Sequence, residues 1–105
     1  MIKSVNARLA QLRKEQNGSY DKGESLYNEG YCQVLSQSTG CFDILIEHYE
    51  EEFEVSIDES DGDLNYYLNG KKNQWDTLGI AALMQVKDAL QDVRPRPALQ
   101  VMFTR

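Results

Sequence analysis

Ten carboxylates fall between residues 43 and 63, and this segment contains no lysine or arginine. Nine of them lie in the stretch IEHYEEEFEVSIDESDGD, residues 46–63. Carboxylates at this density can hold a metal cation or attract a basic protein surface. The formal net charge of the 105-residue chain is −6, but the segment alone carries −10, because the eleven basic and seven acidic side chains elsewhere sum to +4. The negative charge is thus concentrated in one region.

A calcium loop is the first chemistry that this acidic segment suggests. DESDGD, residues 58–63, partly matches the pattern D-x-[DN]-x-[DN]-G. With Gly62 at the sixth position of a twelve-residue loop, Ile57 takes the first and Leu68 the last, where Asp and Glu are required. Both ends fail, so Asp61-Gly62 is better explained as the turn of a β-hairpin. We expect no metal site and no other cofactor.

Catalytic groups are sparse in this sequence. His48 is the single histidine, so an enzyme that used imidazole as its general base would depend on it. There is no G-x-S-x-G nucleophile motif and no glycine-rich phosphate loop. Cys32 and Cys41, with one histidine, are too few for a structural zinc site. We expect a protein that is not an enzyme, with two reduced thiols that favour the cytoplasm.

Two amphipathic helices are predicted to flank the segment that holds the carboxylates. The first is cut off by Asn17-Gly18, since both residue types tolerate the left-handed conformation that ends helices. Its apolar positions recur at steps of three and four, with Ser4 as a candidate cap: Ile2, Val5, Leu9 and Leu12. The second spans residues 74–93, between a cap at Asn73 and the break at Arg94-Pro95. Residues 18–30 are polar and glycine-rich, which predicts a long surface loop with at most one helical turn.

Turn signals between the helices predict a four-stranded antiparallel meander. Asp61-Gly62 fits a type I′ turn, and Ser38-Thr39-Gly40 fits a three-residue loop. A third connection near Glu50-Glu51 has no glycine, proline or asparagine, so turn chemistry does not specify its register. The resulting pairs are Cys32 with Ile46, Val34 with Ile44, Ile46 with Val55, Ile44 with Ile57, Val55 with Leu68, and Ile57 with Tyr66. One sheet face is then apolar and lies under the helices, while the other is polar.

The predicted fold class is therefore α+β, in one domain over residues 1–105. An N-terminal helix precedes the four-stranded antiparallel meander, and a C-terminal helix packs on the same face of the sheet. Residues 94–105 form a tail that contains two prolines. Leu99, Val101 and Phe103 alternate within it, which predicts either a short fifth strand or a strand that pairs with a second copy of the chain.

The polar face of the predicted sheet gathers carboxylates. In this register Glu47 stands opposite Glu54 and Asp43 opposite Asp58, although directly opposed like charges are unfavourable. A face used only for solubility is one explanation, and a docking face for a basic partner is the other. The predicted partner-binding residues are Asp43, Glu47, Glu50, Glu51, Glu52, Glu54, Asp58, Glu59, Asp61 and Tyr67.

The acidic, small, single-domain character is similar to that of phage and mobile-element inhibitors and of toxin immunity proteins. This resemblance covers no specific motif, and it implies docking on a basic partner, such as a nucleic-acid-binding protein, through the carboxylate face. The order of elements is similar to that of secretion chaperones, which implies the alternative: a dimeric chaperone or adaptor that binds through apolar surface and dimerises through residues 99–103. We expect neither direct nucleic-acid binding, which needs basic side chains, nor a membrane span.

Overall fold

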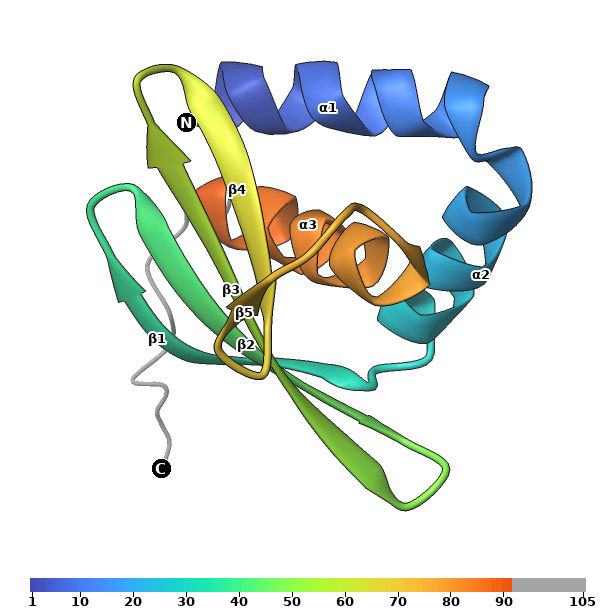
Figure 1. The fold of residues 1–105 in the computed structure, drawn as a ribbon. Coiled ribbons are helices and arrows are strands. Elements are labelled where there is room, and N and C mark those ends of the chain that lie inside the picture. Colours follow the sequence, from blue (N-terminus) through green and yellow to red (C-terminus); the bar gives the residue numbers. More distant parts are fainter. Residues whose placement is uncertain (92–105) are drawn as a thin grey trace.

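The structure is a computed structural model that describes residues 1–91. Three helices lie on one side of a five-stranded antiparallel sheet of order β1-β2-β3-β4-β5 (Figure 1). The elements are α1 (Ile2–Glu15), α2 (Asn17–Asn28), β1 (Cys32–Ser38), β2 (Cys41–His48), β3 (Glu51–Ser60), β4 (Asp63–Leu68), β5 (Lys71–Lys72) and α3 (Thr77–Gln91). The predicted α+β class with helices on a common face is confirmed. The strand predicted over residues 99–103 lies outside the described residues.

Helix α1 follows the predicted apolar stripe. Val5, Leu9 and Leu12 are buried, and its other face carries the basic side chains. The helix begins at Ile2, so Ser4 sits inside the first turn and is not the cap that the sequence suggested. Its hydroxyl instead donates a hydrogen bond across to the sheet.

Helix α2 replaces the loop predicted over residues 18–30. Gly23 explains how a glycine-rich stretch becomes helical, because it is buried against α3. A Cβ at this position would lie 2.8 Å from Cγ2 of Ile80 and 2.9 Å from the carbonyl oxygen of Thr77. Leu26 is buried one turn later. Packing of this face stabilises α2 where intrinsic helix propensity does not.

The hairpin of β3 and β4 has the predicted register. Val55 pairs with Leu68 and Ile57 with Tyr66, around the Asp61-Gly62 turn. The hairpin of β1 and β2 also has its predicted inner pairs, such as Cys32 with Ile46. Its loop is nevertheless shorter than predicted, with Ser38 paired to Cys41, and a β-bulge between Val34 and Ser36 restores the register.

The register between β2 and β3 differs from the prediction by two residues. Ile46 pairs with Phe53 rather than with Val55, because the chain reverses in a tight turn at Tyr49 and Glu50. Both turn residues have positive φ, 53° and 64°. A shift of two residues preserves the face of every side chain, so the predicted apolar face is unchanged.

A short fifth strand, β5, was not predicted. It follows Asn69 and Gly70, whose φ values of 51° and 85° fit a type I′ turn. Lys72 pairs with Tyr67 and Lys71 with Leu68, so the two lysines form the edge of the sheet. Lysine on an edge strand discourages pairing with other chains.

Helix α3 crosses β1, β2 and β3 and covers the apolar face together with α1 and α2 (Figure 1). It begins at Thr77, three residues later than predicted, because the Asp76 side chain accepts a 3.0 Å hydrogen bond from the Gly79 N–H and so caps the helix. The close approach predicted at Gly79 is confirmed: a Cβ there would lie 2.7 Å from the Tyr66 ring. Six core strand residues beneath the helices are at most 1% exposed: Phe42, Ile44, Ile46, Val55, Ile57 and Tyr66.

Candidate functional site

The sheet face that points away from the three helices is here called the open face. Strand alternation and the observed register place sixteen side chains on it: Gln33, Ser36, Ser38, Cys41, Asp43, Leu45, Glu47, Glu52, Glu54, Ser56, Asp58, Ser60, Asp63, Asn65, Tyr67 and Lys72. Six of these sixteen are carboxylates, and Lys72 is the one lysine among them, at the far edge. The face is therefore strongly negative along β2 and β3.

The observed register changes which carboxylates oppose one another. Glu47 stands opposite Glu52 and not opposite Glu54, which pairs with Leu45. The predicted pairing of Asp43 with Asp58 is also wrong, since Asp43 pairs with Ser56. Residues two apart on a strand are separated by about 6.6 Å. The exposed side chains of Glu47, Glu52 and Glu54 thus form one cluster at the β2–β3 end of the open face.

Asp43 differs from this cluster because its carboxylate accepts hydrogen bonds from side chains of the two neighbouring strands. Ser36 donates a 2.6 Å hydrogen bond to one oxygen, and Ser56 donates a 2.6 Å hydrogen bond to the other. These two bonds lower the pKa of Asp43, against a smaller opposing effect of burial. A shallow pocket of about 260 Å³ lies beside the three side chains, with Leu35 and Glu54 also in its lining. Asp43 is thus hydrogen-bonded to both neighbouring strands.

We predict that the double variant Ser36→Ala, Ser56→Ala is less stable than the parent by about 1 kcal/mol at pH 7, because both bonds to the charged Asp43 are lost. The folded-state pKa of Asp43 lies below its unfolded value, so its contribution is present above the unfolded pKa and disappears as the pH falls through the folded pKa. Urea unfolding at pH 7 and at pH 2.5 checks this. An equal difference in stability at both pH values would contradict the assignment.

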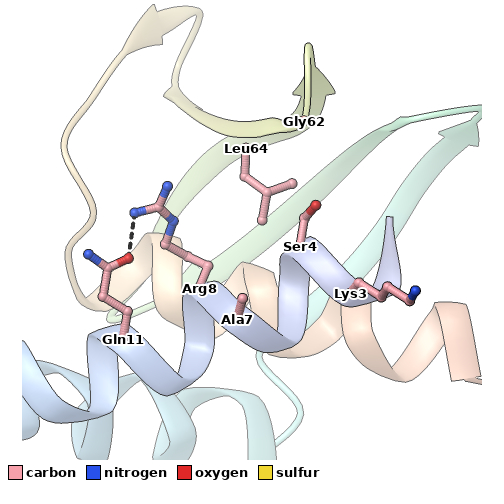
Figure 2. A pocket seen from close by; sticks show the side chains of 7 residues that line it. All are labelled: Lys3, Ser4, Ala7, Arg8, Gln11, Gly62 and Leu64. Carbon is pink, nitrogen blue, oxygen red and sulfur yellow. Dashed lines mark hydrogen bonds between the residues drawn. The ribbon is translucent and has the colours of Figure 1, made fainter.

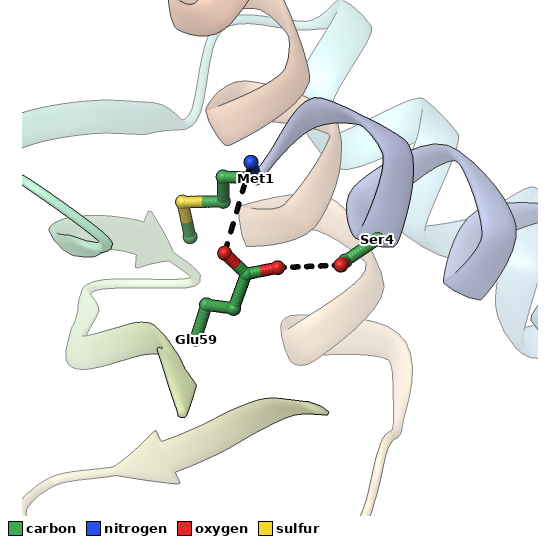
Figure 3. A network of polar contacts seen from close by, with 3 residues as sticks. All are labelled: Met1, Ser4 and Glu59. Atoms are coloured by element: carbon green, nitrogen blue, oxygen red, sulfur yellow. Dashed lines mark hydrogen bonds and ion pairs between the residues drawn. The ribbon is translucent and has the colours of Figure 1, made fainter. Parts of the chain in front are cut away.

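Two further predicted residues also have partners within the protein. Asp58 accepts a 2.9 Å hydrogen bond from the side chain of Asn65. Glu59 lies on the helix side of the sheet, where it accepts a 2.5 Å hydrogen bond from Ser4 and lies 3.7 Å from the amino group of Met1 (Figure 3). Glu59 ties β3 to the start of α1, so it is not part of the open face.

The remaining predicted residues divide between the faces and the turns. Tyr67 is half-buried on the open face. Glu51 pairs with His48, so its position belongs to the other side of the sheet. Glu50 and Asp61 are exposed turn residues at opposite ends of β3. Within residues 1–91, the carboxylates of Glu47, Glu50, Glu51, Glu52 and Glu54 take part in no hydrogen bond or ion pair with protein atoms.

An aromatic group at the β2–β3 turn was missed in the sequence. The rings of Tyr31 and His48 have centroids 5.5 Å apart, and those of His48 and Tyr49 are 3.9 Å apart. Tyr49 is 85% exposed and Tyr31 is 40% exposed. His48 and Tyr49 also line a pocket of about 520 Å³ between the turn and α2, with Leu26, Glu29 and Leu78. Neither Tyr49 nor Glu50 is a residue type that marks a turn, so local sequence carried no signal for this group.

Basic side chains occupy the helix side of the molecule. Lys3 and Arg8 line a pocket of about 320 Å³ between α1 and the β3–β4 turn, close to Gly62 and Leu64 (Figure 2). The Arg8 guanidinium donates a 2.8 Å hydrogen bond to Gln11 and lies 5.7 Å from the ring centroid of Trp75. Negative and positive charge are therefore separated between the open face and α1.

Both cysteines are free thiols. Cys32 lies at the end of the β1–β2 ladder away from the turn, and Cys41 lies next to the turn. Burial raises the pKa of Cys32 to about 11, and burial together with Asp43 and Asp58 raises that of Cys41. Both thiols are protonated at neutral pH, which is the less nucleophilic form. Over residues 1–91, no three His, Cys, Asp or Glu side chains are grouped as metal ligands. None of the helices in this range is long and apolar enough to cross a membrane.

Comparison with protein-family models, curated proteins and solved structures gave no match for this chain. Function is therefore inferred from the geometry and charge of the open face. The cluster of Glu47, Glu52 and Glu54 can form charge-assisted hydrogen bonds with arginine or lysine side chains of another molecule.

Proposed function

We propose that this chain is a small protein-binding module of the inhibitor or immunity type, which docks on a basic protein through its open face. A nucleic-acid-binding protein is a suitable partner, because carboxylates can stand where phosphates would bind. The two free cysteines are typical of a reducing compartment, and we propose the cytoplasm as the place of action.

One observation carries this proposal: three exposed carboxylates lie together, and within residues 1–91 none of them forms an ion pair. Glu47 and Glu52 are directly opposed across β2 and β3, and Glu54 follows on the same face. Opposed like charges cost the free protein stability. A face that serves solubility alone would relieve that cost by mixing lysine among the glutamates, whereas residues 1–91 place one lysine on it, Lys72 on the edge strand. The repulsion would be relieved in a complex with a basic surface.

The test compares two variants that remove the same amount of charge at different places. The first is the open-face variant Glu47→Gln, Glu52→Gln, Glu54→Gln. The second is the helix control Glu15→Gln, Asp21→Asn, Glu24→Gln, in which all three positions are exposed on α1 and α2. Each variant loses three negative charges, so long-range effects of net charge are matched while the docking face differs.

We expect the open-face variant to associate with its captured and identified partner about tenfold more slowly than the parent at low salt, because steering by complementary charge acts on this rate. The salt dependence of its rate should be largely lost, and its free energy of unfolding should hold or rise by a few tenths of a kcal/mol. Stopped-flow association over a salt series measures this. Equal association rates for the parent and both variants would indicate that the open face serves solubility only.

A further inference from the structure

We propose that the aromatic turn at Tyr49 binds an arginine side chain of the partner and thereby selects arginine-rich over lysine-rich surfaces. This inference rests on the proposed function and adds the chemistry of the residue that is recognised. It is carried by three features of the turn: an exposed ring, the carboxylates around it, and the backbone conformation that holds both in place.

The Tyr49 ring is available to a ligand. One side of it lies against His48, with ring centroids 3.9 Å apart, yet the residue remains 85% exposed. The face of a tyrosine ring attracts cations, and a guanidinium can stack on it while its N–H groups stay free. An ammonium lacks this planar stacking geometry. An exposed ring supported from behind is thus a suitable platform for arginine.

Carboxylates surround the platform. Glu50 is the other residue of the turn, Glu51 pairs with His48, and Glu52 pairs with Glu47 at the start of the open face. Among the described residues, the adjacent 520 Å³ pocket has one basic side chain in its lining, Lys22, and Glu29 lines the same pocket. Because Glu50 adjoins Tyr49 in the turn, a guanidinium stacked on the ring would lie near a carboxylate that can accept charge-assisted hydrogen bonds. This local charge fits a cation and disfavours an anion.

The backbone of this turn is unusual by comparison with two other turns in the same sheet. The Asp61-Gly62 and Asn69-Gly70 turns have φ values of 53° and 81°, and of 51° and 85°. Both use the residue types that tolerate positive φ. Tyr49 and Glu50 adopt φ values of 53° and 64° with bulky side chains, which raises the energy of the folded state. The turn keeps two side chains that its backbone disfavours, as expected where those side chains have a use.

The experiment measures binding of hexa-arginine and hexa-lysine peptides by titration calorimetry at matched low salt. Parent protein should bind hexa-arginine about two- to fivefold more tightly, the range that an exposed cation–π contact gives. Tyr49→Phe should keep the preference because the ring remains, and Tyr49→Leu should lose it although apolar area remains. NMR shifts of the amides around residue 49 on titration with hexa-arginine should follow the same order.

A second variant separates the turn's side chains from its shape. The double variant Tyr49→Asn, Glu50→Gly installs favoured turn residues, so its thermal unfolding midpoint should rise by about 4–8 °C while the preference for arginine disappears. Equal affinity for both peptides in the parent, or a preference that survives Tyr49→Leu, would overturn this inference. If the parent binds both peptides equally and the open-face variant binds both more weakly, the proposed function is supported and the preference for arginine is not. If neither peptide binds, both proposals fail.

Discussion

Ile57→Ala should lower the free energy of unfolding by about 2–5 kcal/mol, the range for truncating a large buried aliphatic side chain. Ile57 is fully buried at the centre of the sheet. It pairs with Phe42 on one side and with Tyr66 on the other, and both neighbours are themselves 1% exposed. Backbone hydrogen bonds hold all three strands, so the core cannot collapse readily into the space left behind. Urea unfolding followed by fluorescence or circular dichroism measures the loss.

Two companion variants make this prediction sharper. Ile57→Val removes one methylene group and should cost about 0.5–1.5 kcal/mol, in keeping with a graded cavity effect. Leu45→Ala removes a similar side chain from the open face, where Leu45 is only half-buried, and should cost less than Ile57→Ala. A larger loss for Leu45→Ala would mean that the two faces of the sheet have been exchanged by a one-residue slip of register.

The strands were predictable from the sequence where turn chemistry is explicit. Asp61-Gly62 specifies its turn through residue types that tolerate positive φ, and the pairs on either side follow from it. Alternation then assigns each side chain to a face even where the register is wrong. The error of two residues between β2 and β3 left Ile44, Ile46 and Val55 on the apolar face for this reason.

Other elements depended on contacts that local sequence does not reveal. Helix α2 contains Gly18 and Gly23, and the low helix propensity of glycine predicted a loop there. Gly23 nevertheless allows the helix to approach α3 closely. The fifth strand had a usable signal in Asn69-Gly70, but Lys71 and Lys72 are not apolar and gave no strand pattern. Neither Tyr49 nor Glu50 is a residue type that favours turns, so the register between β2 and β3 could not be predicted from the sequence.

The candidate site was predicted in part. The acidic character of the open face followed from alternation, and Glu47, Glu52 and Glu54 lie there as exposed side chains. Hydrogen bonds between distant residues could not be read from the sequence, which is why Asp43 and Glu59 were assigned to docking although each has partners within the protein. Residue type determines the charge of the face, whereas tertiary contacts determine which carboxylates have partners within the protein.

Asp76→Ala should lower the free energy of unfolding by about 2–4 kcal/mol, because one carboxylate both caps α3 and accepts a hydrogen bond from a buried tyrosine. Its Oδ1 atom accepts a 3.0 Å hydrogen bond from the Gly79 N–H, which caps α3 and is worth roughly 0.5–2 kcal/mol. The same atom accepts a 2.9 Å hydrogen bond from the hydroxyl of Tyr66. Burial and Asp76 raise the pKa of that hydroxyl, so it stays protonated and needs an acceptor. Leaving it unpaired costs about 1–3 kcal/mol more.

Asp76→Asn is the matched control, since an amide oxygen can still accept both hydrogen bonds. This variant loses the favourable charge at the N-terminus of α3, which is worth about 0.3–1 kcal/mol, and a long, exposed hydrogen bond of 3.4 Å from the Asn73 side chain. Tyr66→Phe removes the hydroxyl, so in that background Asp76→Ala should cost only the helix cap. Thermal and urea unfolding of the three variants and the double variant form a cycle that isolates the Tyr66 contribution. Equal costs of Asp76→Ala in both backgrounds would show that the hydroxyl needs no partner, and Asp76 would then act as a cap for α3 and nothing more.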